Sequence, residues 1–505
     1  MLRGLMTLSL GITVLAAGTA RAATPLDGVW LFDDAPSYPG VTMVKLSSEG
    51  GKPHGFVTTA WYGPMEMRNL VVQGGKATFE LRNLNDKDHA TRQWTAVLTG
   101  KALKLSGDIW YAHVEQAGRP GTAADARARA FRTTALPPLG TLAPDGLART
   151  PPMGWSSWNK FAEKIDDKTV RAMADALVAT GLRDAGYVYV NIDDGWQGTR
   201  GPDGAIRPNE KFPDMKGLAD YVHARGLKFG LYSAPGPRTC AGYEGSYGHV
   251  QQDAKTFADW GVDYLKYDLC SGEWFYDDAD KVQRTYYEMG AALRATGRPI
   301  VYSLCEYGRF EVGAWGRKVG GHLWRTTGDI TDDYATMARI GFDKNGRAEH
   351  AGPGGWNDPD MLEIGNGGMS HDEYATHMTL WAMSAAPLMM GHDLRQSSPE
   401  VLKMLENREV IAVDQDALGV QGKAVRREGS TEVWTKPLAD GAVAVALFNR
   451  GEAAATMGLL PSDAGKSGLT AVRDLWRGVD LPAGSQNFQV PAHGVVMLRV
   501  TGGQG

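Results

Sequence analysis

The chain has 505 residues, and 43% of them are hydrophobic, which is enough to bury one large core and to form smaller domains beside it. Its formal net charge at pH 7 is −5, and the sequence contains no basic block and no long run of like charges. This distribution argues against nucleic acid as a partner and against a segment that binds a membrane surface.

The first 22 residues have the pattern of a secretory signal peptide. Arg3 is followed by an apolar stretch from Leu5 to Ala17 and by a small-residue triplet that ends at Ala22, so we expect cleavage after Ala22. The apolar stretch is too short to span a membrane, and no other run approaches the required length of about twenty residues. The sequence therefore predicts residues 1–22 as a signal peptide and a secreted or periplasmic mature protein.

Residues 23–135 are predicted to form an N-terminal antiparallel β domain. They contain alternating stretches such as KATFELRN (76–83) and RQWTAVLTG (92–100), separated by glycine-containing turns. Such alternation is typical of a β-meander in a small barrel or sandwich. The sequence assigns no role to this domain, and both sugar binding and a purely structural function stay open. Residues 136–152 are rich in proline, glycine and small residues and are predicted to be a linker.

From residue 153 to residue 418, strand and helix patterns alternate. The eight expected strands lie in residues 153–161, 187–193, 227–233, 262–268, 299–305, 322–329, 354–362 and 387–391. Each is followed by a helical pattern or by the remnant of one, as in KTVRAMADALVATGL. This repeat predicts an α/β fold, a closed (β/α)8 TIM barrel. Residues 419–505 return to alternation without helices and predict a C-terminal antiparallel β-sandwich.

Five carboxylates lie at the carboxyl ends of the expected barrel strands. They are Asp193, Asp194, Asp268, Asp329 and Asp360. In a TIM barrel, the carboxyl ends of the strands form the active-site face. A single aspartate at such a junction is often only the N-cap of the next helix. Five N-caps on one rim are not expected, and two cations and three aromatic rings are expected beside them: Lys266, Arg325, Trp158, Tyr232 and Tyr307.

Lys266 and Asp268 are two residues apart in the expected strand 262–268, so their side chains point to the same side of the sheet. An opposite charge nearby lowers the pKa of a carboxyl group. We therefore expect Lys266 to keep a poorly solvated Asp268 ionised.

The expected rim has the composition of a sugar site. It contains no histidine pair and no Cys–His cluster at ligand spacing, so no metal is expected. No glycine-rich fingerprint follows a strand, so no dinucleotide cofactor is expected either. Carboxylates accept hydrogen bonds from sugar hydroxyls, and aromatic rings stack on the apolar face of a sugar. The chemistry that two carboxylates best support is glycoside hydrolysis.

Several motifs resemble those of glycoside hydrolase family 27, the α-galactosidase or melibiase family. In chain order they are DGLARTPPMGWSSWNKF, NIDDGWQ, GLYSAPGPRTCAGYEGSYG, FADWGVDYLKYDLC, LWRTTGDI, AGPGGWNDPDMLEIGNGG and AAPLMMGHDLR. The resemblance covers about residues 145–422, and KYDLC and GGWNDPDML are its most specific parts. The C-terminal sandwich fits the layout of the family, whereas the N-terminal domain lies outside the resemblance.

The resemblance implies a role for each matching residue. Asp268 corresponds to the nucleophile and Asp329 to the general acid and base of a retaining mechanism through a covalent glycosyl-enzyme. Asp193 and Asp194 match the pair that holds the 4- and 6-hydroxyls of the sugar. Further pocket positions are Trp158, Tyr232, Cys240, Lys266, Arg325, Asp360 and Met361. The resemblance also implies a disulfide between Cys240 and Cys270, which export permits, and leaves Cys305 as a free thiol.

One motif departs from the family pattern. Many members have Cys-Glu-Trp-Gly after the fifth strand, whereas this chain has LCEYG, which puts Tyr307 in the place of a tryptophan. Strand alternation puts Cys305 and Tyr307 on one face and Glu306 on the other, so we expect the first two to be pocket walls. In the family this region meets the 2-position of the sugar.

The leading hypothesis is an exported α-galactosidase that acts on galactose-containing oligosaccharides or glycoconjugates. Alternatives within the family are an α-N-acetylgalactosaminidase, a β-L-arabinopyranosidase and an isomaltose-releasing dextran hydrolase. Asp194 favours a hydroxymethyl group at C5 and argues against the arabinopyranosidase. A non-catalytic sugar-binding module is a further alternative, against which the presence of both Asp268 and Asp329 argues. The oligomeric state stays open.

Overall fold

The computed structural model describes residues 23–33, 40–48, 52–59, 61–82, 91–109, 112–128 and 134–504. The predicted signal peptide, residues 1–22, lies outside the described residues. The chain divides into two compact units between residues 132 and 133. Within the described ranges, no helix has both the length and the apolar character that a membrane span needs.

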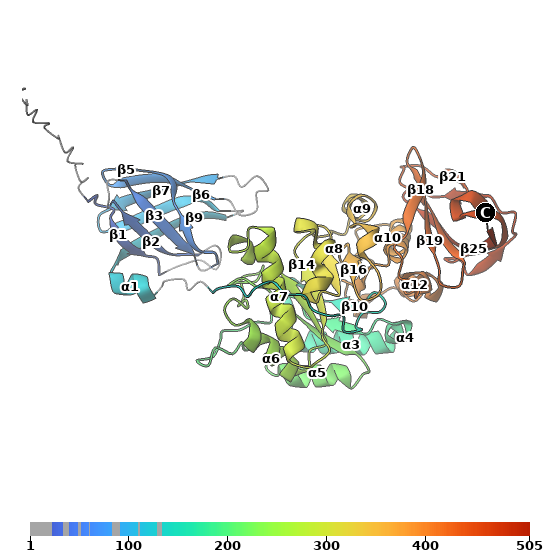
Figure 1. Ribbon diagram of the computed structural model, residues 1–505, viewed down its shortest axis with the longest axis horizontal. Coiled ribbons are helices and arrows are strands. Elements are labelled where there is room, and N and C mark those ends of the chain that lie inside the picture. Colours follow the sequence, from blue (N-terminus) through green and yellow to red (C-terminus); the bar gives the residue numbers. More distant parts are fainter. Residues whose placement is uncertain are drawn as a thin grey trace, which may run out of the picture. The chain divides into compact units, whose positions relative to one another are not determined.

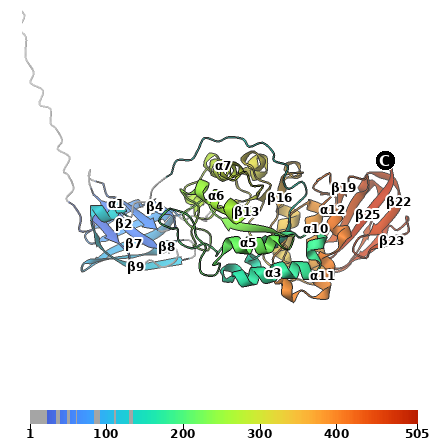
Figure 2. The ribbon, with the colours of Figure 1, turned by 90° about the horizontal axis from the view of Figure 1, so that it is seen from below.

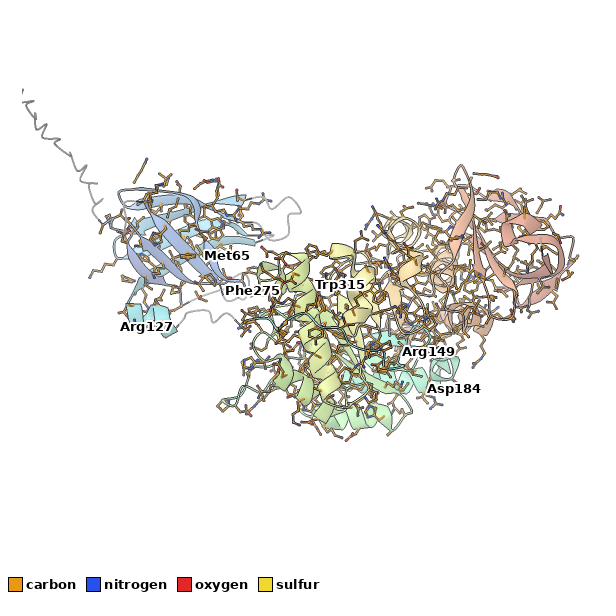
Figure 3. The ribbon with its side chains drawn as sticks, viewed as in Figure 1. Met65, Arg127, Arg149, Asp184, Phe275 and Trp315 are labelled. Carbon is orange, nitrogen blue, oxygen red and sulfur yellow. A yellow bond between two sulfur atoms is a disulfide. The ribbon has the colours of Figure 1, made fainter. Side chains whose placement is uncertain are left out.

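The first unit contains a nine-stranded antiparallel sheet, blue in Figure 1. Its strands are β1 (Gly28–Leu31), β2 (Val41–Ser47), β3 (His54–Thr59), β4 (Gly63–Glu66), β5 (Arg68–Gln73), β6 (Lys76–Arg82), β7 (Thr91–Thr99), β8 (Ala102–Ile109) and β9 (Ala112–Gly121), followed by the short helix α1 (Ala123–Ala128). Two meanders, β1–β4 and β5–β9, are joined because β1 pairs with β9. Phe79 and Trp94 are buried in its core, as is Met65, which Figure 3 labels. The prediction of an N-terminal all-β domain is confirmed.

The second unit begins with an eight-stranded parallel sheet. Its strands are β10 (Met153–Ser156), β11 (Tyr189–Asn191), β12 (Lys228–Ser233), β13 (Tyr264–Asp268), β14 (Val301–Cys305), β15 (Leu323–Arg325), β16 (Trp356–Asp358) and β17 (Leu388–Met390). Neighbours follow chain order, and β17 returns to pair with β10. A further parallel bridge joins Leu362, just after β16, to Met390 and closes the ring. The predicted TIM barrel is confirmed.

Helices surround this barrel. The α-helices are α2 (Trp158–Phe161), α3 (Asp167–Ala179), α4 (Leu182–Ala185), α5 (Met215–His223), α6 (Val250–Trp260), α7 (Ala279–Ala295), α8 (Val312–Trp315), α9 (Tyr334–Ala338), α10 (His371–Ser384), α11 (Pro399–Leu405) and α12 (Arg408–Asp414). Six short 3₁₀ turns among the described barrel residues are Ala162–Lys164, Gly272–Trp274, Arg309–Glu311, Gly316–Val319, Ala348–His350 and Leu394–Gln396, and a π-helical turn spans Arg339–Lys344. Aspartates do cap some of these helices, as Asp166, Asp214, Asp278 and Asp333 show. None of the five rim aspartates is among these capping residues.

Residues 134–152, which we call the strap, lie along the barrel in an extended conformation (Figure 2). Arg284 of α7 donates hydrogen bonds to the carbonyl oxygens of Leu136 (2.8 Å) and Pro137 (2.7 Å). Asp145 forms ion pairs with His322 (2.9 Å) and Arg294 (2.8 Å). The segment 136–152, predicted as a linker, is therefore attached to the barrel over much of its length.

The C-terminal strands form two packed sheets, red in Figure 1. They are β18 (Lys423–Glu428), β19 (Thr431–Pro437), β20 (Val443–Asn449), β21 (Ala455–Gly458), β22 (Lys466–Asp474), β23 (Val479–Leu481), β24 (Asn487–Val490) and β25 (Val495–Gln504), with a 3₁₀ turn at Pro461–Ala464. The order β18-β19-β20-β25-β22-β23 forms one sheet, and β21-β24 forms the other. Val445, Met457 and Leu498 lie in the core between them. The predicted sandwich is confirmed.

Candidate active site

A pocket of about 100 Å³ lies at the carboxyl ends of the barrel strands. Every predicted catalytic and sugar-binding residue except Cys305 lines it, and Cys270 of the predicted disulfide does not. Two lining residues, Asn159 and Ile330, were not predicted. The full lining is Trp158, Asn159, Asp193, Asp194, Tyr232, Cys240, Lys266, Asp268, Tyr307, Arg325, Asp329, Ile330, Asp360 and Met361. Cavities for drug-sized ligands have volumes of about 300–1,000 Å³. The smaller volume here suits one small polar group, such as a single sugar unit.

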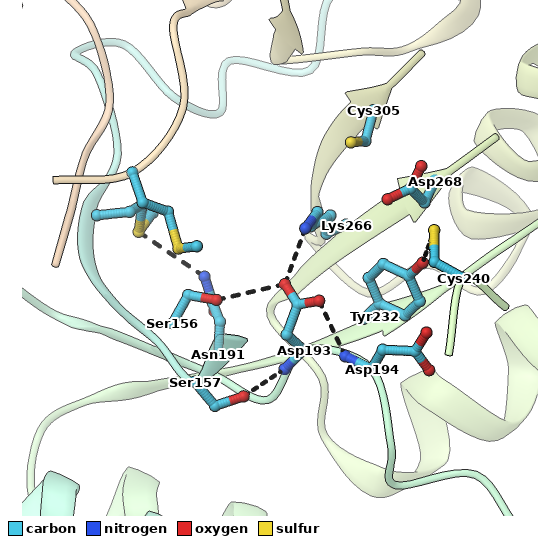
Figure 4. Close-up of polar contacts among 12 residues, drawn as sticks. Ser156, Ser157, Asn191, Asp193, Asp194, Tyr232, Cys240, Lys266, Asp268 and Cys305 are labelled. Carbon is cyan, nitrogen blue, oxygen red and sulfur yellow. Dashed lines mark hydrogen bonds and ion pairs between the residues drawn. The ribbon is translucent and has the colours of Figure 1, made fainter. Parts of the chain in front are cut away.

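Asp193 lines the pocket and is fixed by four contacts (Figure 4). Its Oδ2 atom lies 2.9 Å from Lys266 Nζ and 3.4 Å from Ser156 Oγ. Its own backbone N–H donates to Ser157 Oγ at 3.0 Å. The N–H of Asp194 donates to its Oδ1 at 2.9 Å. The direct ion-pair partner of Lys266 is therefore Asp193, a contact that strand alternation did not predict.

Asp194 is almost completely buried beside Asp193. Its two carboxylate oxygens accept hydrogen bonds from the backbone N–H groups of Gly195 and Ala241, each at 2.8 Å. Burial raises the pKa of Asp194 to about 7, because desolvation outweighs these hydrogen bonds. The contact with Ala241 links this carboxylate to the loop that carries Cys240.

Asp268 is the last residue of β13 and is only 4% exposed. Its Oδ1 atom accepts hydrogen bonds from the Leu269 N–H at 2.8 Å and from the Tyr307 hydroxyl at 2.6 Å. Burial raises the pKa of Asp268 above its ordinary value, although the charge of Lys266 and the Tyr307 hydrogen bond both lower it. Lys266 thus favours the ionised form, as expected, but burial has the larger effect.

Arg325, the last residue of β15, connects two of the other carboxylates. It is 3% exposed, and its Nη2 atom lies 3.0 Å from Asp329 Oδ1 and 2.9 Å from Asp360 Oδ2. The Asp329 side chain is 72% exposed at the mouth of the pocket. Partial desolvation opposes ionisation of Asp329, but the charge of Arg325 prevails and lowers its pKa. Asp268 and Asp329 therefore have pKa values displaced in opposite directions.

Two pocket residues have backbone conformations that are unusual for their type. Tyr307 has φ 63° and Asp360 has φ 89°, both in the left-handed region. Such conformations cost about 1–3 kcal/mol each and persist where the surrounding structure imposes them. At Asp360 the Oδ2 atom accepts the Ile330 N–H at 2.9 Å, in addition to its ion pair with Arg325.

A disulfide joins Cys240 to Cys270, the pairing that the family resemblance implies. The hydroxyl of Tyr232 donates to the sulfur of Cys240 at 3.1 Å, so this wall is tied to β12 (Figure 4). Among the described residues, Cys240, Asp268 and Cys270 form the one cluster with spacing suited to a metal ion. Because its two sulfurs are bonded to each other, the cluster has no thiolate to offer.

Cys305 differs from the expectation that it forms a pocket wall. It is completely buried, is absent from the pocket lining, and its sulfur accepts a hydrogen bond from Arg325 Nη1 at 3.8 Å. Strand alternation was used to put the side chains of Cys305 and Tyr307 on the same face. It does not apply to this pair, because β14 ends at Cys305 and the chain turns at Tyr307. Glu306 is buried away from the pocket, with its Oε1 atom accepting the Gly308 N–H.

Sequence reasoning missed Asn159 and Ile330. Asn159 directly follows Trp158 and donates a hydrogen bond to Glu363, whose pKa is raised to about 7 by burial. Asn159 lies in the same sequence motif as Trp158, and this position could have identified it as a pocket residue. Ile330 directly follows Asp329, and an apolar residue at this place gives no chemical signal.

The arrangement combines two carboxylates in contrasting environments. Asp268 is buried and has one carboxylate oxygen without a hydrogen-bond donor from the described chain, which is the environment of a nucleophile. Asp329 lies at the mouth, where a leaving group departs. One carboxylate beside the sugar and one beside the leaving group are the requirements of glycoside hydrolysis.

Comparison with known proteins gives one consistent family. Residues 150–416 match the family model described as alpha galactosidase A, and residues 428–500 match the alpha galactosidase C-terminal beta sandwich domain. An alpha-galactosidase from Cyamopsis tetragonoloba is 47% identical over 368 residues, which cover 71% of this chain and 88% of that protein.

Solved structures give the same result. Alpha-galactosidase I from Mortierella vinacea has a TM-score of 0.66 and 34% identity, with coverage of 72% of this chain and 99% of that one. An alpha-galactosidase from Saccharomyces cerevisiae with raffinose has a TM-score of 0.65 and 29% identity, with coverage of 71% of this chain and 100% of that one.

Proposed function

Because the chain belongs to the alpha galactosidase A family, glycoside hydrolase family 27, we propose that it removes terminal α-linked galactose from oligosaccharides or glycoconjugates. The observation that carries the proposal is the joint presence of Asp268 and Asp329 in one pocket of single-sugar size. The alpha-galactosidase from Saccharomyces cerevisiae was solved with raffinose, a sugar that has a terminal galactose of this kind.

We assign the covalent step to Asp268. A lone pair of its carboxylate attacks the anomeric carbon of galactose, and the bond from that carbon to the glycosidic oxygen breaks. The electron pair of that bond goes to the oxygen, which receives a proton from Asp329. In the second step, water attacks the same carbon and gives a proton to Asp329. The bond to Asp268 breaks, its electron pair returns to the carboxylate, and the two inversions retain the configuration.

Proton distribution sets a condition on the first step. In the free pocket the pKa of Asp268 is raised and that of Asp329 is lowered, whereas the step needs the proton on Asp329. The glycosidic oxygen of a bound substrate accepts a hydrogen bond from protonated Asp329 and so favours its neutral form. The two carboxyl groups interact, so the pH dependence of activity belongs to the pair.

The remaining pocket residues bind the sugar in this proposal. Asp193 and Asp194 accept hydrogen bonds from its 4- and 6-hydroxyls, and Trp158 provides an apolar surface. Lys266 Nζ lies 2.9 Å from Asp193 Oδ2 and holds this carboxylate in place. The presence of Asp194 favours galactose over a pentose, because a pentose has no hydroxymethyl group to reach it.

We also propose that the protein is exported. Residues 1–22 have the signal-peptide pattern, and the Cys240–Cys270 disulfide is compatible with an oxidising compartment. Mass spectrometry of the N-terminus after expression with and without residues 1–22 checks the expected cleavage after Ala22.

A panel of nitrophenyl glycosides tests the activity. We expect rapid release of nitrophenol from p-nitrophenyl-α-galactoside, and slow release from the α-N-acetylgalactosaminide and the β-L-arabinopyranoside. The Asp268→Ala variant serves as the blank for contaminating hydrolases. If the wild-type protein cleaves either competing glycoside faster than the α-galactoside, the proposed specificity for galactose is wrong. If it cleaves none of the three, the proposed activity is wrong.

A further inference from the structure

The hydroxyl of Tyr307 is the shortest polar contact of Asp268 among the described residues. It donates to Asp268 Oδ1 at 2.6 Å, and the Leu269 N–H donates to the same oxygen at 2.8 Å. The other oxygen, Oδ2, receives no hydrogen bond from the described part of the chain. The two oxygens of this carboxylate are therefore not equivalent.

The disulfide holds this hydroxyl in place. Its sulfurs lie 3.6 Å (Cys270) and 3.8 Å (Cys240) from the Tyr307 oxygen, and disulfide sulfurs are only weak acceptors. Asp268 Oδ1 is thus the strong acceptor available to the phenol. The carboxylate that accepts this hydrogen bond is buried, and a hydrogen bond in a buried environment is electrostatically stronger than one in water.

The backbone conformation around Tyr307 determines the direction of its side chain. Tyr307 itself has φ 63°, and Gly308 follows at φ 78°. A Cβ atom at Gly308 would lie 2.2 Å from the carbonyl oxygen of Thr326, so only glycine fits there. The carboxylate of Glu306 accepts the Gly308 N–H at 3.1 Å and fixes this turn. A costly local conformation held by several contacts indicates that the position of the phenol matters.

We propose that Tyr307 is a positioning residue whose hydroxyl holds Asp268 Oδ1, leaves Oδ2 as the attacking oxygen and stabilises the carboxylate when it leaves the glycosyl-enzyme. This inference rests on the proposed function. It goes beyond the expectation that Tyr307 only forms the wall at the sugar 2-position.

The two chemical steps respond oppositely to this hydrogen bond. In the first step, the Oδ2 lone pair forms the bond to the anomeric carbon, and the negative charge that the phenol stabilises moves to the leaving oxygen. In the second step, water attacks, the Oδ2–carbon bond breaks and its electron pair returns to the carboxylate. The hydrogen bond therefore becomes weaker in the first step and stronger in the second. Its loss slows the release of galactose more than the attack on the substrate.

The Tyr307→Phe variant tests this with p-nitrophenyl-α-galactoside. Hydrogen bonds to charged groups are worth enough to lower kcat by about 10- to 100-fold. Because the intermediate accumulates, KM falls together with kcat, and kcat/KM changes by less than about threefold. A pre-steady-state burst of nitrophenol becomes larger than in the wild type, and intact-protein mass spectrometry detects the hexosyl adduct.

The pH profile gives a second readout. The Tyr307 hydrogen bond lowers the pKa of Asp268, so its removal raises that pKa. The acidic limb of the kcat/KM profile of Tyr307→Phe therefore moves to higher pH than in the wild type. The charged groups that interact with Asp268 and influence this titration include Lys266, Arg325 and Asp329, and Glu273 just after β13.

Two further variants separate this role from damage to the fold. Tyr302→Phe removes the buried hydroxyl of a tyrosine within β14, which donates to the Tyr286 carbonyl oxygen at 3.2 Å, and is expected to keep wild-type kinetics. Tyr307→Trp retains an N–H donor and is expected to show a smaller burst than Tyr307→Phe.

The outcomes distinguish the two hypotheses. If the wild type does not cleave the galactoside, the proposed function fails. If the wild type is active but Tyr307→Phe has no enlarged burst and an unchanged acidic limb, the positioning role fails and the proposed function stands. Equal bursts in Tyr307→Phe and Tyr307→Trp also overturn the role of the donor.

Discussion

Asp268 and Asp329 have different environments, and the proposed roles follow from this difference. Asp268 is buried at the end of β13, whereas Asp329 is largely exposed and lies four residues after Arg325. A nucleophile must reach the anomeric carbon inside the pocket, while an acid must reach the glycosidic oxygen at the mouth. Exchange of the two roles would put the acid out of reach of the leaving group.

Replacement of each carboxylate by alanine is predicted to give azide products of opposite configuration. In Asp268→Ala, azide attacks the galactoside directly and yields the β-galactosyl azide, because no glycosyl-enzyme forms. In Asp329→Ala, p-nitrophenyl-α-galactoside still glycosylates Asp268, because nitrophenol leaves without an acid. Azide then attacks the intermediate and yields the α-galactosyl azide. NMR spectroscopy of the products reads the configuration directly.

Poor leaving groups provide the control for this experiment. Without azide, Asp329→Ala is expected to lose far more activity on raffinose than on the nitrophenyl substrate, because an alcohol needs protonation to leave. An α-azide from Asp268→Ala together with a β-azide from Asp329→Ala would reverse the assignment.

The chemistry of the rim could be predicted from sequence, but its pairings could not. Aspartates soon after strand ends indicated a shared pocket, and the residues that cap helices, such as Asp166 and Asp214, stand directly before a helix instead. Lys266 lowers the pKa of Asp268 as expected, but its ion pair with Asp193 of the neighbouring loop was not predicted. Strand alternation predicts on which face of the sheet a side chain lies. Its contact partner also depends on the conformation of the loops, which shows no periodic pattern in the sequence.

At the scale of elements, the loops after β12, β13 and β14 meet through the disulfide and Tyr307. The disulfide joins Cys240, in the loop after β12, to Cys270, which lies two residues after the end of β13. Tyr307 comes from the turn after β14. Arg200 fixes the first of these loops from behind through a buried ion pair with Asp253 (2.7 Å) and a contact with Glu244 (3.1 Å). Three loops thus support one wall of the pocket.

Removal of this disulfide is predicted to lower both stability and activity. Its two cysteines are 30 residues apart, and closing a loop of this length contributes about 3–4 kcal/mol. We expect Cys240→Ser combined with Cys270→Ser to unfold at lower denaturant concentration. We also expect it to lose activity, because the Tyr307 hydroxyl loses the atoms packed against it. Denaturant titrations and initial rates measure the two effects.

Thiol titration checks the pairing itself. We expect no reactive thiol in the native protein and one per chain after denaturation without reductant, since Cys305 is buried and free. Three reactive thiols in the denatured protein would contradict the disulfide.

Asp145→Asn is predicted to loosen the strap in a pH-dependent way. Burial opposes ionisation of Asp145, but the hydrogen bond from His322 and the charge of Arg294 lower its pKa to about 2. A lowered carboxyl pKa stabilises the fold above the ordinary value of 3.8 and stops doing so as the pH falls toward 2. The variant should be less stable than the wild type by about 1–3 kcal/mol at pH 7, and the difference should shrink below pH 4.

Asp259→Asn is the matched control for that comparison. Asp259 pairs with Lys255 on α6, but its side chain is 61% exposed, and exposed pairs contribute little. Thermal inactivation, measured at several pH values, compares the stability of the barrel in both variants. A pH-independent difference for Asp145→Asn would show that the ion pairs do not stabilise the strap.

At the scale of the whole molecule, the sequence predicted the fold class of each part, because each part has its own period. Alternation with glycine turns marked the two β parts, and strand–helix repeats marked the barrel. The sequence was a weaker guide to which segments are attached to the barrel. A stretch rich in proline and glycine, residues 136–152, has the composition of a free spacer, yet its backbone carbonyls and Asp145 find partners on the barrel. Composition does not report such partners.

Removal of the first unit is predicted to leave catalysis intact. Every pocket residue belongs to the second unit, so a chain that starts at residue 134 should keep wild-type kcat and KM on the nitrophenyl substrate. A chain that starts at residue 150 lacks most of the strap and should lose activity at a lower temperature. Loss of activity in a correctly folded chain starting at residue 134 would mean that the pocket needs the first unit.

The strap also orders events during synthesis. Its partners follow it at long range along the chain: Arg284 lies 148 residues after Leu136, His322 lies 177 after Asp145, and Trp356 lies 208 after Ala148. Domains fold as units while the chain emerges, the N-terminal one first. The first unit can therefore be complete before any partner of the strap has been translated. The strap can therefore gain its contacts only in stages: Arg284 emerges after the fourth barrel strand, His322 before the sixth, and Trp356 with the seventh, β16, so that β17 is the one strand still missing when the last of these partners appears.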